Sequence, residues 1–224
     1  MISIIIPCLN EESNIQATLE CLQPMRRRGH QIIVVDGGST DNTILSSDFL
    51  ADKVIRTSPG RGRQMNAGAD IAQGDILWFL HADTLVPADL DRHLETTLAE
   101  SGKVWGRFDV RLSGNKTLLR FVEVLMNWRS RLTGIATGDQ GVFICHKSWQ
   151  QTGGFADIAL MEDIELSRRL KKNFGRPLCL SRKLLTSSRR WESHGLLKTI
   201  LLMWRLRLQY ALGADPAILA RKYR

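Results

Sequence analysis

The sequence of 224 residues lacks several features that would assign it at once to a common class of protein. It contains no apolar run of the roughly 20 residues that a bilayer-spanning helix needs. The segment Gly60-Arg61-Gly62 is followed by Met65 where a dinucleotide-binding fingerprint would have its third glycine. A P-loop is absent as well. These absences exclude a helical membrane span and two common nucleotide-binding loops, so any bound nucleotide must be held in another way.

Cysteine is scarce, and none of the four cysteines forms a Cys-x-x-Cys pair or a zinc pattern with a nearby histidine. Reduced, mostly buried thiols are typical of a cytosolic protein. The first seven residues contain no basic region and no small-residue cleavage site, so we expect no signal peptide. We therefore expect a cytoplasmic protein with free thiols at Cys8, Cys21, Cys145 and Cys179.

Acidic residues are scarce only in the last quarter of the chain. Residues 1–100 hold eight Lys and Arg against fourteen Asp and Glu, whereas residues 168–224 hold fifteen against two. The formal net charge of +8 therefore combines an acidic N-terminal part with a strongly basic C-terminal part. A strongly basic segment of this kind is typical of proteins that bind nucleic acid, an anionic membrane or a phosphorylated small molecule.

Short apolar runs alternate with segments of helical periodicity through about residue 100, which predicts an α/β protein with a doubly wound, largely parallel sheet. Pro7 is expected to end the first strand. Further along the chain we expect two more strands and two more helices. The expected strands are 2–6, 31–35, 53–56, 76–80, 104–112 and 141–145, and the expected helices are 11–23, 62–72, 161–171 and 196–212.

Acidic or amide side chains follow three of the expected strands. They are Asn10-Glu11, Asp36 and Asp83. Ligands of doubly wound sheets bind at the carboxyl ends of the strands. His81-Ala82-Asp83 is a candidate metal–diphosphate site, because a divalent ion bound by a carboxylate can bridge two phosphates. The alternative is that Asp83 only caps a helix.

Two further segments carry candidate chemistry. The adjacent carboxylates Glu162-Asp163 stand at a helix start, where one could act as a general base, although complementing the helix dipole would also explain them. The segment Ser188-Arg189-Arg190-Trp191-Glu192 could clamp a phosphate and stack a ring, or it could be a solvated basic stretch with one buried tryptophan.

Taken together and in order, these segments resemble the family 2 glycosyltransferases, which are inverting enzymes of the GT-A fold. The resemblance covers about residues 2–192 and is closest to a compact bacterial-type subgroup that shares Trp-Gly-Arg-Phe-Asp-Val, Gly-Asp-Gln and Ser-Ser-Arg-Arg-Trp-Glu. The segments that carry it are Pro7-Cys8-Leu9-Asn10-Glu11, Asp36 to Thr43, Arg63 to Gly68, His81-Ala82-Asp83, Gly153-Gly154-Phe155 with Glu162-Asp163, and Arg190-Trp191.

The resemblance implies a mixed, mostly parallel central sheet flanked by helices. It also implies a catalytic domain over residues 1–192, followed by a basic, apolar helical extension over residues 193–224. The implied reaction moves a sugar from a nucleotide-diphosphate donor to an acceptor hydroxyl with inversion. Asp163 would be the base, supported by Glu162, and Asp83 would ligate Mn²⁺ or Mg²⁺. Pro7, Leu9, Glu11, Asp36, Arg63, Asn66 and Ala82 would contact the nucleotide, and Arg190 and Trp191 the diphosphate or the acceptor.

Three positions depart from the family pattern. His81 replaces the first aspartate of Asp-x-Asp, Ser187 replaces the glutamine of Gln-x-x-Arg-Trp, and Leu9 replaces an aromatic residue that is often found there. The departure at His81 implies either weaker metal binding or binding through the one carboxylate together with water.

The final helix is apolar on most sides, with Lys198, Arg205 and Arg207 as its cations. It could pack against the catalytic domain or against a second subunit in a homodimer. It could also lie on an anionic membrane, in which case the acceptor would be lipid-linked.

Two other functions compete with glycosyl transfer. A nucleotidyltransferase would use a similar sheet, but its first loop would be basic and rich in glycine, whereas Pro7 to Glu12 is acidic and free of glycine. A basic membrane- or nucleic-acid-binding protein would leave the carboxylates at three strand ends unexplained. We therefore expect a nucleotide-sugar partner and no nucleic acid.

Overall fold

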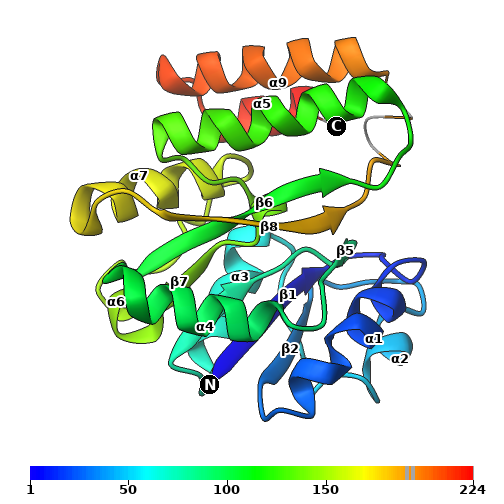
Figure 1. Cartoon of the computed structure of the whole chain (residues 1–224). Helices are drawn as coiled ribbons and strands as arrows, with labels where there is room; N and C mark the ends of the chain where they lie inside the picture. Colours follow the sequence, from blue (N-terminus) through cyan, green and yellow to red (C-terminus); the bar gives the residue numbers. More distant parts are fainter. Residues whose placement is uncertain (190–191, 193–194, 224) are drawn as a thin grey trace.

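The computed structural model describes residues 1–189, 192 and 195–223. An eight-stranded sheet runs in the order β3-β2-β1-β4-β7-β6-β8-β5. Helices cover both of its faces (Figure 1). The strands are β1 (Ile2–Cys8), β2 (Gln31–Asp36), β3 (Lys53–Arg56), β4 (Ile76–Phe79), β5 (Thr84–Leu85), β6 (Trp105–Leu112), β7 (Phe143–Cys145) and β8 (Leu178–Thr186).

The helices follow the strands in an order typical of an α/β protein. They are α1 (Ile15–Arg26), α2 (Thr43–Ser47), α3 (Arg61–Asp70), α4 (Leu90–Ser101), α5 (Thr117–Thr133), α6 (His146–Gln150), α7 (Glu162–Phe174), α9 (Leu196–Ala211) and α10 (Pro216–Tyr223), with a short 3-10 helix η1 (Gly138–Gln140).

Strands β3, β2, β1 and β4 are adjacent and parallel. Because β1 is buried on both faces, its sequence is a continuous apolar run. Ile4 packs in the core under α1 and α4, whereas Ile5 packs on the opposite face with residues of α3 and α7. The chain leaves β1 toward β2 on one side and returns with β4 on the other, which places a topological switch point between β1 and β4.

The second half of the sheet is mixed. Strand β7 pairs antiparallel with both β4 and β6, β8 pairs parallel with β6, and β5 pairs antiparallel with β8. Four neighbouring pairs are therefore parallel and three antiparallel. The prediction of a mixed, mostly parallel sheet flanked by helices is confirmed.

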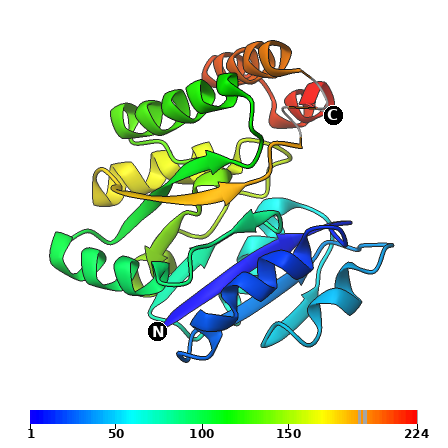
Figure 2. The same ribbon diagram turned by 45° about the vertical axis from the view of Figure 1, so that its right-hand side comes forward.

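Helix α5 lies over β6, α9 lies beside α5 on the side away from the sheet, and α10 turns back beneath α9 (Figures 1 and 2). Leu196 and Ile200 of α9 pack on a cluster formed by α5 and β6. Leu206 of α9 is fully buried against Met161 and Ile164 at the start of α7. In the described part of the chain, no helix combines the length and the apolar character that crossing a bilayer requires.

The prediction that Pro7 ends the first strand is wrong, because β1 continues to Cys8 and Pro7 pairs with Val35 of β2. The carbonyl of Ile5 accepts a hydrogen bond from the amide of Leu80. The backbone polar groups of every second residue of β1 therefore point toward β4, and Pro7 is one of these residues. Strand β4 has already ended opposite Pro7. The amide hydrogen that proline lacks would have had no ladder partner there, which makes proline tolerable at this position.

Candidate functional site

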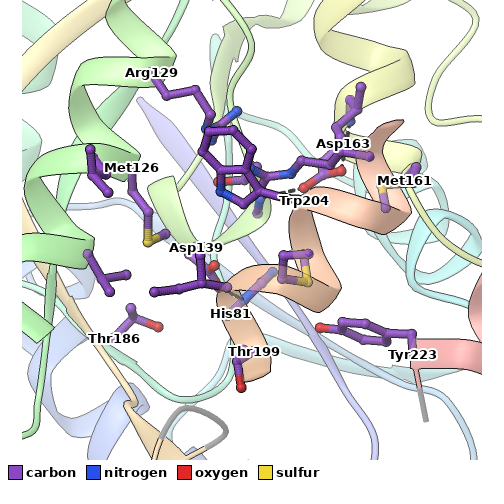
Figure 3. Close-up of a pocket in the computed structure, with 18 of the residues that line it drawn as sticks. His81, Met126, Arg129, Asp139, Met161, Asp163, Thr186, Thr199, Trp204 and Tyr223 are labelled. Carbon is purple, nitrogen blue, oxygen red and sulfur yellow. Dashed lines mark hydrogen bonds and ion pairs between the residues drawn. The ribbon is translucent and has the colours of Figure 1, made fainter. Parts of the chain in front are cut away.

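Two adjoining cavities open at the carboxyl ends of β1 and β4. The larger has a volume of about 770 Å³ and the smaller about 410 Å³. The larger cavity is walled by α5 and α9 and reaches the start of α7 (Figure 3). The two cavities meet at residues that line both of them, namely Glu11, Arg61, His81, Asp83, Leu160, Glu162 and Tyr223.

The smaller cavity is lined by the loops that follow β1 and β4, by the start of α3, by residues around the start of α7 and by α10. It brings together five of the predicted nucleotide and metal residues, which are Pro7, Leu9, Glu11, Ala82 and Asp83. Helix α1 holds the loop after β4, because the hydroxyl of Thr18 donates a hydrogen bond to the carbonyl of Ala82 at 2.8 Å.

The loop after β1 is hydrogen-bonded to the loop after β2 and to the first residue of α2. The amide of Asn10 donates to Ser39 Oγ and the amide of Glu11 donates to Thr43 Oγ1, both at 2.8 Å. Asn10 has a φ of 53°, a left-handed conformation that asparagine tolerates better than most residues. This turn holds the carboxylate of Glu11 at the junction of the cavities, where Arg189 Nη2 contacts it at 3.2 Å.

Three predicted nucleotide residues lie outside the linings of both cavities. Asp36 is fully buried and accepts hydrogen bonds from the amides of Gly38 and Ser39, so its carboxylate stabilises the loop after β2. Asn66 exchanges two hydrogen bonds with the backbone of Phe155, at 2.8 and 2.9 Å. Arg63 forms an ion pair with Asp157 at 2.6 Å. In this structure all three side chains stabilise loops around the site.

Asp83 stands at the junction of the cavities, and within the described part of the chain its carboxylate has no hydrogen bond or ion pair. Burial raises its pKa, the charges of Asp139 and Glu11 add to that effect, and the charge of His81 opposes it. An unpaired carboxylate among other acidic groups is a favourable place for a cation. His81 Nε2 is also buried and unpartnered among the described residues.

The donor set fits a divalent ion that arrives with a diphosphate. Among the residues that the structure describes, no three His, Cys, Asp or Glu side chains are grouped closely enough to hold a metal by themselves. Mg²⁺ is commonly bound through one or two carboxylates together with substrate phosphates and water. Asp83 can supply one such carboxylate, so the protein alone provides only part of a coordination shell.

His81 is held by Asp139, whose carboxylate lies 3.3 Å from its Nδ1. Asp139 belongs to η1, which is fixed by a capping box between Thr137 and Gln140. Burial raises the pKa of Asp139, but the hydrogen bond and charge of His81 outweigh that effect, and its pKa is lowered overall. Asp139 therefore stays ionised and orients the imidazole.

Glu162 and Asp163 begin α7, directly after Met161, which has a left-handed φ of 72°. Asp163 accepts hydrogen bonds from the amides of Gly138 at 3.0 Å and Ile164 at 2.7 Å. These two bonds fix a carboxylate that faces the larger cavity alone. Its neighbour Glu162 faces both cavities and lies 3.7 Å from Arg61. Burial raises the pKa of Glu162, and the charge of Asp163 raises it further.

Four site residues were not singled out from the sequence. Arg61 lines both cavities, although the motif pointed to Arg63. Asp139 lies in the Gly-Asp-Gln segment, which had been matched to the subgroup without a role. Arg129 and Arg207 face the larger cavity from α5 and α9, and no local motif marks them. Arg190 and Trp191 lie outside the described residues, so their predicted contacts with diphosphate or acceptor stay predictions.

Comparison with protein families and curated sequences gives consistent matches. The model of glycosyl transferase family 2 matches residues 3–154. A probable glycosyltransferase of Bacillus subtilis, YdaM, is 28% identical over 97% of this chain and 56% of its own length. An uncharacterized glycosyltransferase of Mycobacterium tuberculosis is 34% identical over 50% of this chain and 47% of its own length. The chain thus spans about half the length of these relatives.

Solved structures with the same fold include TarS of S. aureus, residues 1–349, with a TM-score of 0.70 and 18% identity over 84% of this chain and 60% of that chain. Glucosyl-3-phosphoglycerate synthase of Mycobacterium tuberculosis, solved with Mn²⁺, uridine diphosphate and glucosyl-3-phosphoglycerate, has a TM-score of 0.62 and 19% identity over 83% of this chain and 70% of that chain. At these identities the likeness establishes the fold, and the expected GT-A architecture is confirmed.

Proposed function

Because the chain belongs to glycosyl transferase family 2, we propose that it moves a sugar from a nucleotide-diphosphate donor to an acceptor hydroxyl with inversion at the anomeric carbon. One observation carries this proposal. The cavity formed by the strand-end loops meets a second, larger cavity at Asp83 and Glu162, and Asp163 faces the second cavity alone. Such a junction lets a donor and an acceptor meet at their reacting atoms.

The donor occupies the smaller cavity in this proposal. Pro7, Leu9, Glu11 and Ala82 contact the nucleoside and ribose, and the diphosphate points toward the junction. Arg61, which lines both cavities, faces the diphosphate and offsets its charge. Related structures support a uridine diphosphate donor, since TarS has been solved with UDP-GlcNAc and glucosyl-3-phosphoglycerate synthase with uridine diphosphate.

A divalent ion, Mn²⁺ or Mg²⁺, would be held by Asp83 together with the diphosphate oxygens. When bound, it supplies positive charge that stabilises the leaving diphosphate. Glucosyl-3-phosphoglycerate synthase has been solved with Mn²⁺ and with Mg²⁺, which supports either ion. The contribution of this chain is the unpaired carboxylate of Asp83 beside the buried imidazole of His81.

Asp163 is the base in this proposal. The acceptor oxygen attacks the anomeric carbon as the bond from that carbon to the diphosphate oxygen breaks, and the hydroxyl proton passes to Asp163. The amides of Gly138 and Ile164 orient the carboxylate while leaving it acceptor capacity for that proton. One displacement of this kind inverts the anomeric configuration. Glu162 keeps its neighbour in place and pairs with Arg61.

We further propose that the enzyme works in the cytoplasm at the surface of an anionic membrane, and that its acceptor is lipid-linked. Residues 1–192 form the catalytic domain, and residues 193–224 carry the membrane contact. The exposed large apolar side chains of α9 support this proposal, since they lie at helical spacing beside basic residues. These side chains are Leu201, Trp204 and Leu208, and the exposed Leu212 follows directly after the helix.

Liposome flotation tests the membrane proposal. We expect the protein to float with anionic liposomes at low salt, and a Leu201→Glu/Leu208→Glu variant to stay in solution. Equal flotation of both proteins would reject the contact through α9. A homodimer that buried the same face would instead show a concentration-dependent mass by light scattering.

A donor panel tests the proposed reaction. Incubating the protein with UDP-glucose, UDP-GlcNAc and GDP-mannose plus Mn²⁺ should give slow release of nucleotide from one donor. Asp83→Ala should remove the metal dependence of nucleotide binding, whereas Asp70→Ala, an exposed carboxylate outside both cavities, serves as the control. Failure of every donor to bind with or without metal would count against glycosyl transfer.

A further inference from the structure

The larger cavity has a composition that the donor does not explain. Its walls are apolar over most of their extent, with Val122 and Met126 from α5 and Ile200 and Met203 from α9. A nucleotide sugar is polar throughout, and the smaller cavity proposed for it has no residue of α5 or α9 in its lining. The larger cavity therefore favours a ligand with a substantial apolar part.

Two guanidinium groups nevertheless face this apolar cavity. Arg129 and Arg207 line it, and in the described part of the chain neither side chain has a hydrogen bond or an ion pair. Nε and Nη2 of Arg129 and Nε of Arg207 are buried. Asp163 and Asp139 are close enough for their charges to act on both groups, but neither carboxylate pairs with them. Buried cations without partners are costly, and they persist where a function needs them.

The electrostatics of the two arginines favour an anionic ligand. Burial lowers the pKa of Arg129 to about 10, and the charge of Arg207 lowers it further. Burial also lowers the pKa of Arg207. Two guanidiniums that face one largely apolar cavity offer a site for an anion, since the planar fork of arginine matches phosphate oxygens.

The rim of the cavity is apolar as well. Trp128 of α5 and Trp204 of α9 line the cavity and are 60% and 67% exposed. Figure 3 shows Arg129 coming from α5 and Trp204 from the facing helix α9. The exposed apolar side chains continue along both helices, so the rim is continuous with a larger apolar face.

We propose that the larger cavity is the acceptor site and that it takes an amphiphilic anion, a lipid whose phosphate lies next to the accepting hydroxyl. Arg129 and Arg207 bind the phosphate, the walls of α5 and α9 hold the apolar chain, and Asp163 faces the hydroxyl. This assignment rests on the proposed glycosyl transfer for the identity of the acceptor, but the lipid-phosphate site can be tested without turnover. The donor diphosphate is a poor candidate for the arginines, because neither of them lines the smaller cavity.

Binding of decyl phosphate below its micelle concentration, measured by calorimetry on the full chain, tests the site. Inorganic phosphate and decanol separate the contributions of the anion and the chain. We expect decyl phosphate to bind more tightly than either. Arg129→Met or Arg207→Met should weaken it about 10- to 100-fold, the range that hydrogen bonds to a charged group contribute. Arg92→Met is the matched control, because Arg92 is exposed on α4 and lines neither cavity.

Every outcome of this experiment decides the proposal. Equal affinity for inorganic and decyl phosphate would indicate a soluble phosphorylated acceptor and overturn the lipid assignment. Binding that both Met variants retain would overturn the role of the arginines. If those variants do not fold, Trp204→Ala, at an exposed rim position, must still weaken decyl phosphate. Donor binding is measured separately from decyl phosphate binding. If the protein shows no glycosyl transfer but still binds decyl phosphate, the proposed glycosyl transfer is rejected while the lipid-phosphate site stands.

Discussion

Replacing Arg129 by methionine should make the protein more stable. The pKa of this guanidinium falls from its ordinary value of 12.5 to about 10, chiefly because it is buried and secondly because of the charge of Arg207. A difference of this size means that the cavity destabilises the charged form by about 3 kcal/mol. Methionine preserves much of the apolar stem and removes the charge. The lost packing of the longer side chain offsets part of the gain, so we expect about 1 to 3 kcal/mol.

Thermal unfolding in a chloride buffer without phosphate or sulfate measures this gain. For a chain of this size, such a gain corresponds to a rise in Tm of roughly 2 to 12 °C. Because the folded state lowers the pKa of Arg129, the penalty is present in full well below pH 10 and shrinks as the pH rises through about 10. The difference in Tm between the variant and the parent should therefore narrow above that pH.

The control for this prediction is Arg92→Met, which changes an exposed arginine of α4 and should alter stability by no more than about 0.5 kcal/mol. A fall in Tm for Arg129→Met, with the control unchanged, would contradict the predicted gain in stability. It would mean that the guanidinium makes a net favourable contact in the ligand-free protein, and the case for an anion site would lose its energetic basis.

Three further predictions concern the same region. Gly138→Ala places a Cβ against His81 Nε2, so we expect the free energy of unfolding, measured with a chemical denaturant, to fall by about 1 to 3 kcal/mol. An unchanged denaturation midpoint would show that the imidazole moves freely. Because burial raises the pKa of Glu162 above 4.5, Glu162→Gln should raise Tm at neutral pH, and this advantage should shrink as the pH falls through the raised pKa and be gone near 4.5; a constant difference in Tm from neutral pH to 4.5 would contradict the raised pKa. Burial and nearby carboxylates raise the pKa of Cys8 to about 12, so Cys8 should resist iodoacetamide at pH 8 in the native protein. Rapid labelling of Cys8, detected by mass spectrometry, would show that this thiol is accessible.

The strands of the parallel half could be predicted because burial on both faces leaves a plain apolar run in the sequence. Strand β8 could not, since several of its central residues, including Arg182 and Lys183, are exposed and break that pattern. Helix α5 was missed for the opposite reason. It has buried apolar residues such as Val122 on one face and exposed ones such as Trp128 on another, which hides the periodicity.

The candidate site was predictable where chemistry sits in a local motif. Glu11, Asp83 and Asp163 follow a strand or begin a helix, and the fold brings all three to the cavities. Arg129 and Arg207 come from helices that lie far apart in the sequence, and only the packing of α5 beside α9 turns them into a pair. Arg61 was missed since the direction of a side chain on α3 depends on where that helix begins.

Donor hydrolysis by Asp163→Asn, measured beside the parent protein, tests most directly whether Asp163 is the base at the junction of the cavities. With the donor found by the panel, we predict that slow hydrolysis falls about 10²- to 10⁴-fold, the usual contribution of a general base. The donor dissociation constant should stay the same, because Asp163 does not line the smaller cavity. Asp70→Asn should match the parent in both measurements. Hydrolysis by Asp163→Asn at the parental rate would show that Asp163 is not the base. A loss of affinity for the donor would show that Asp163 contributes to donor binding.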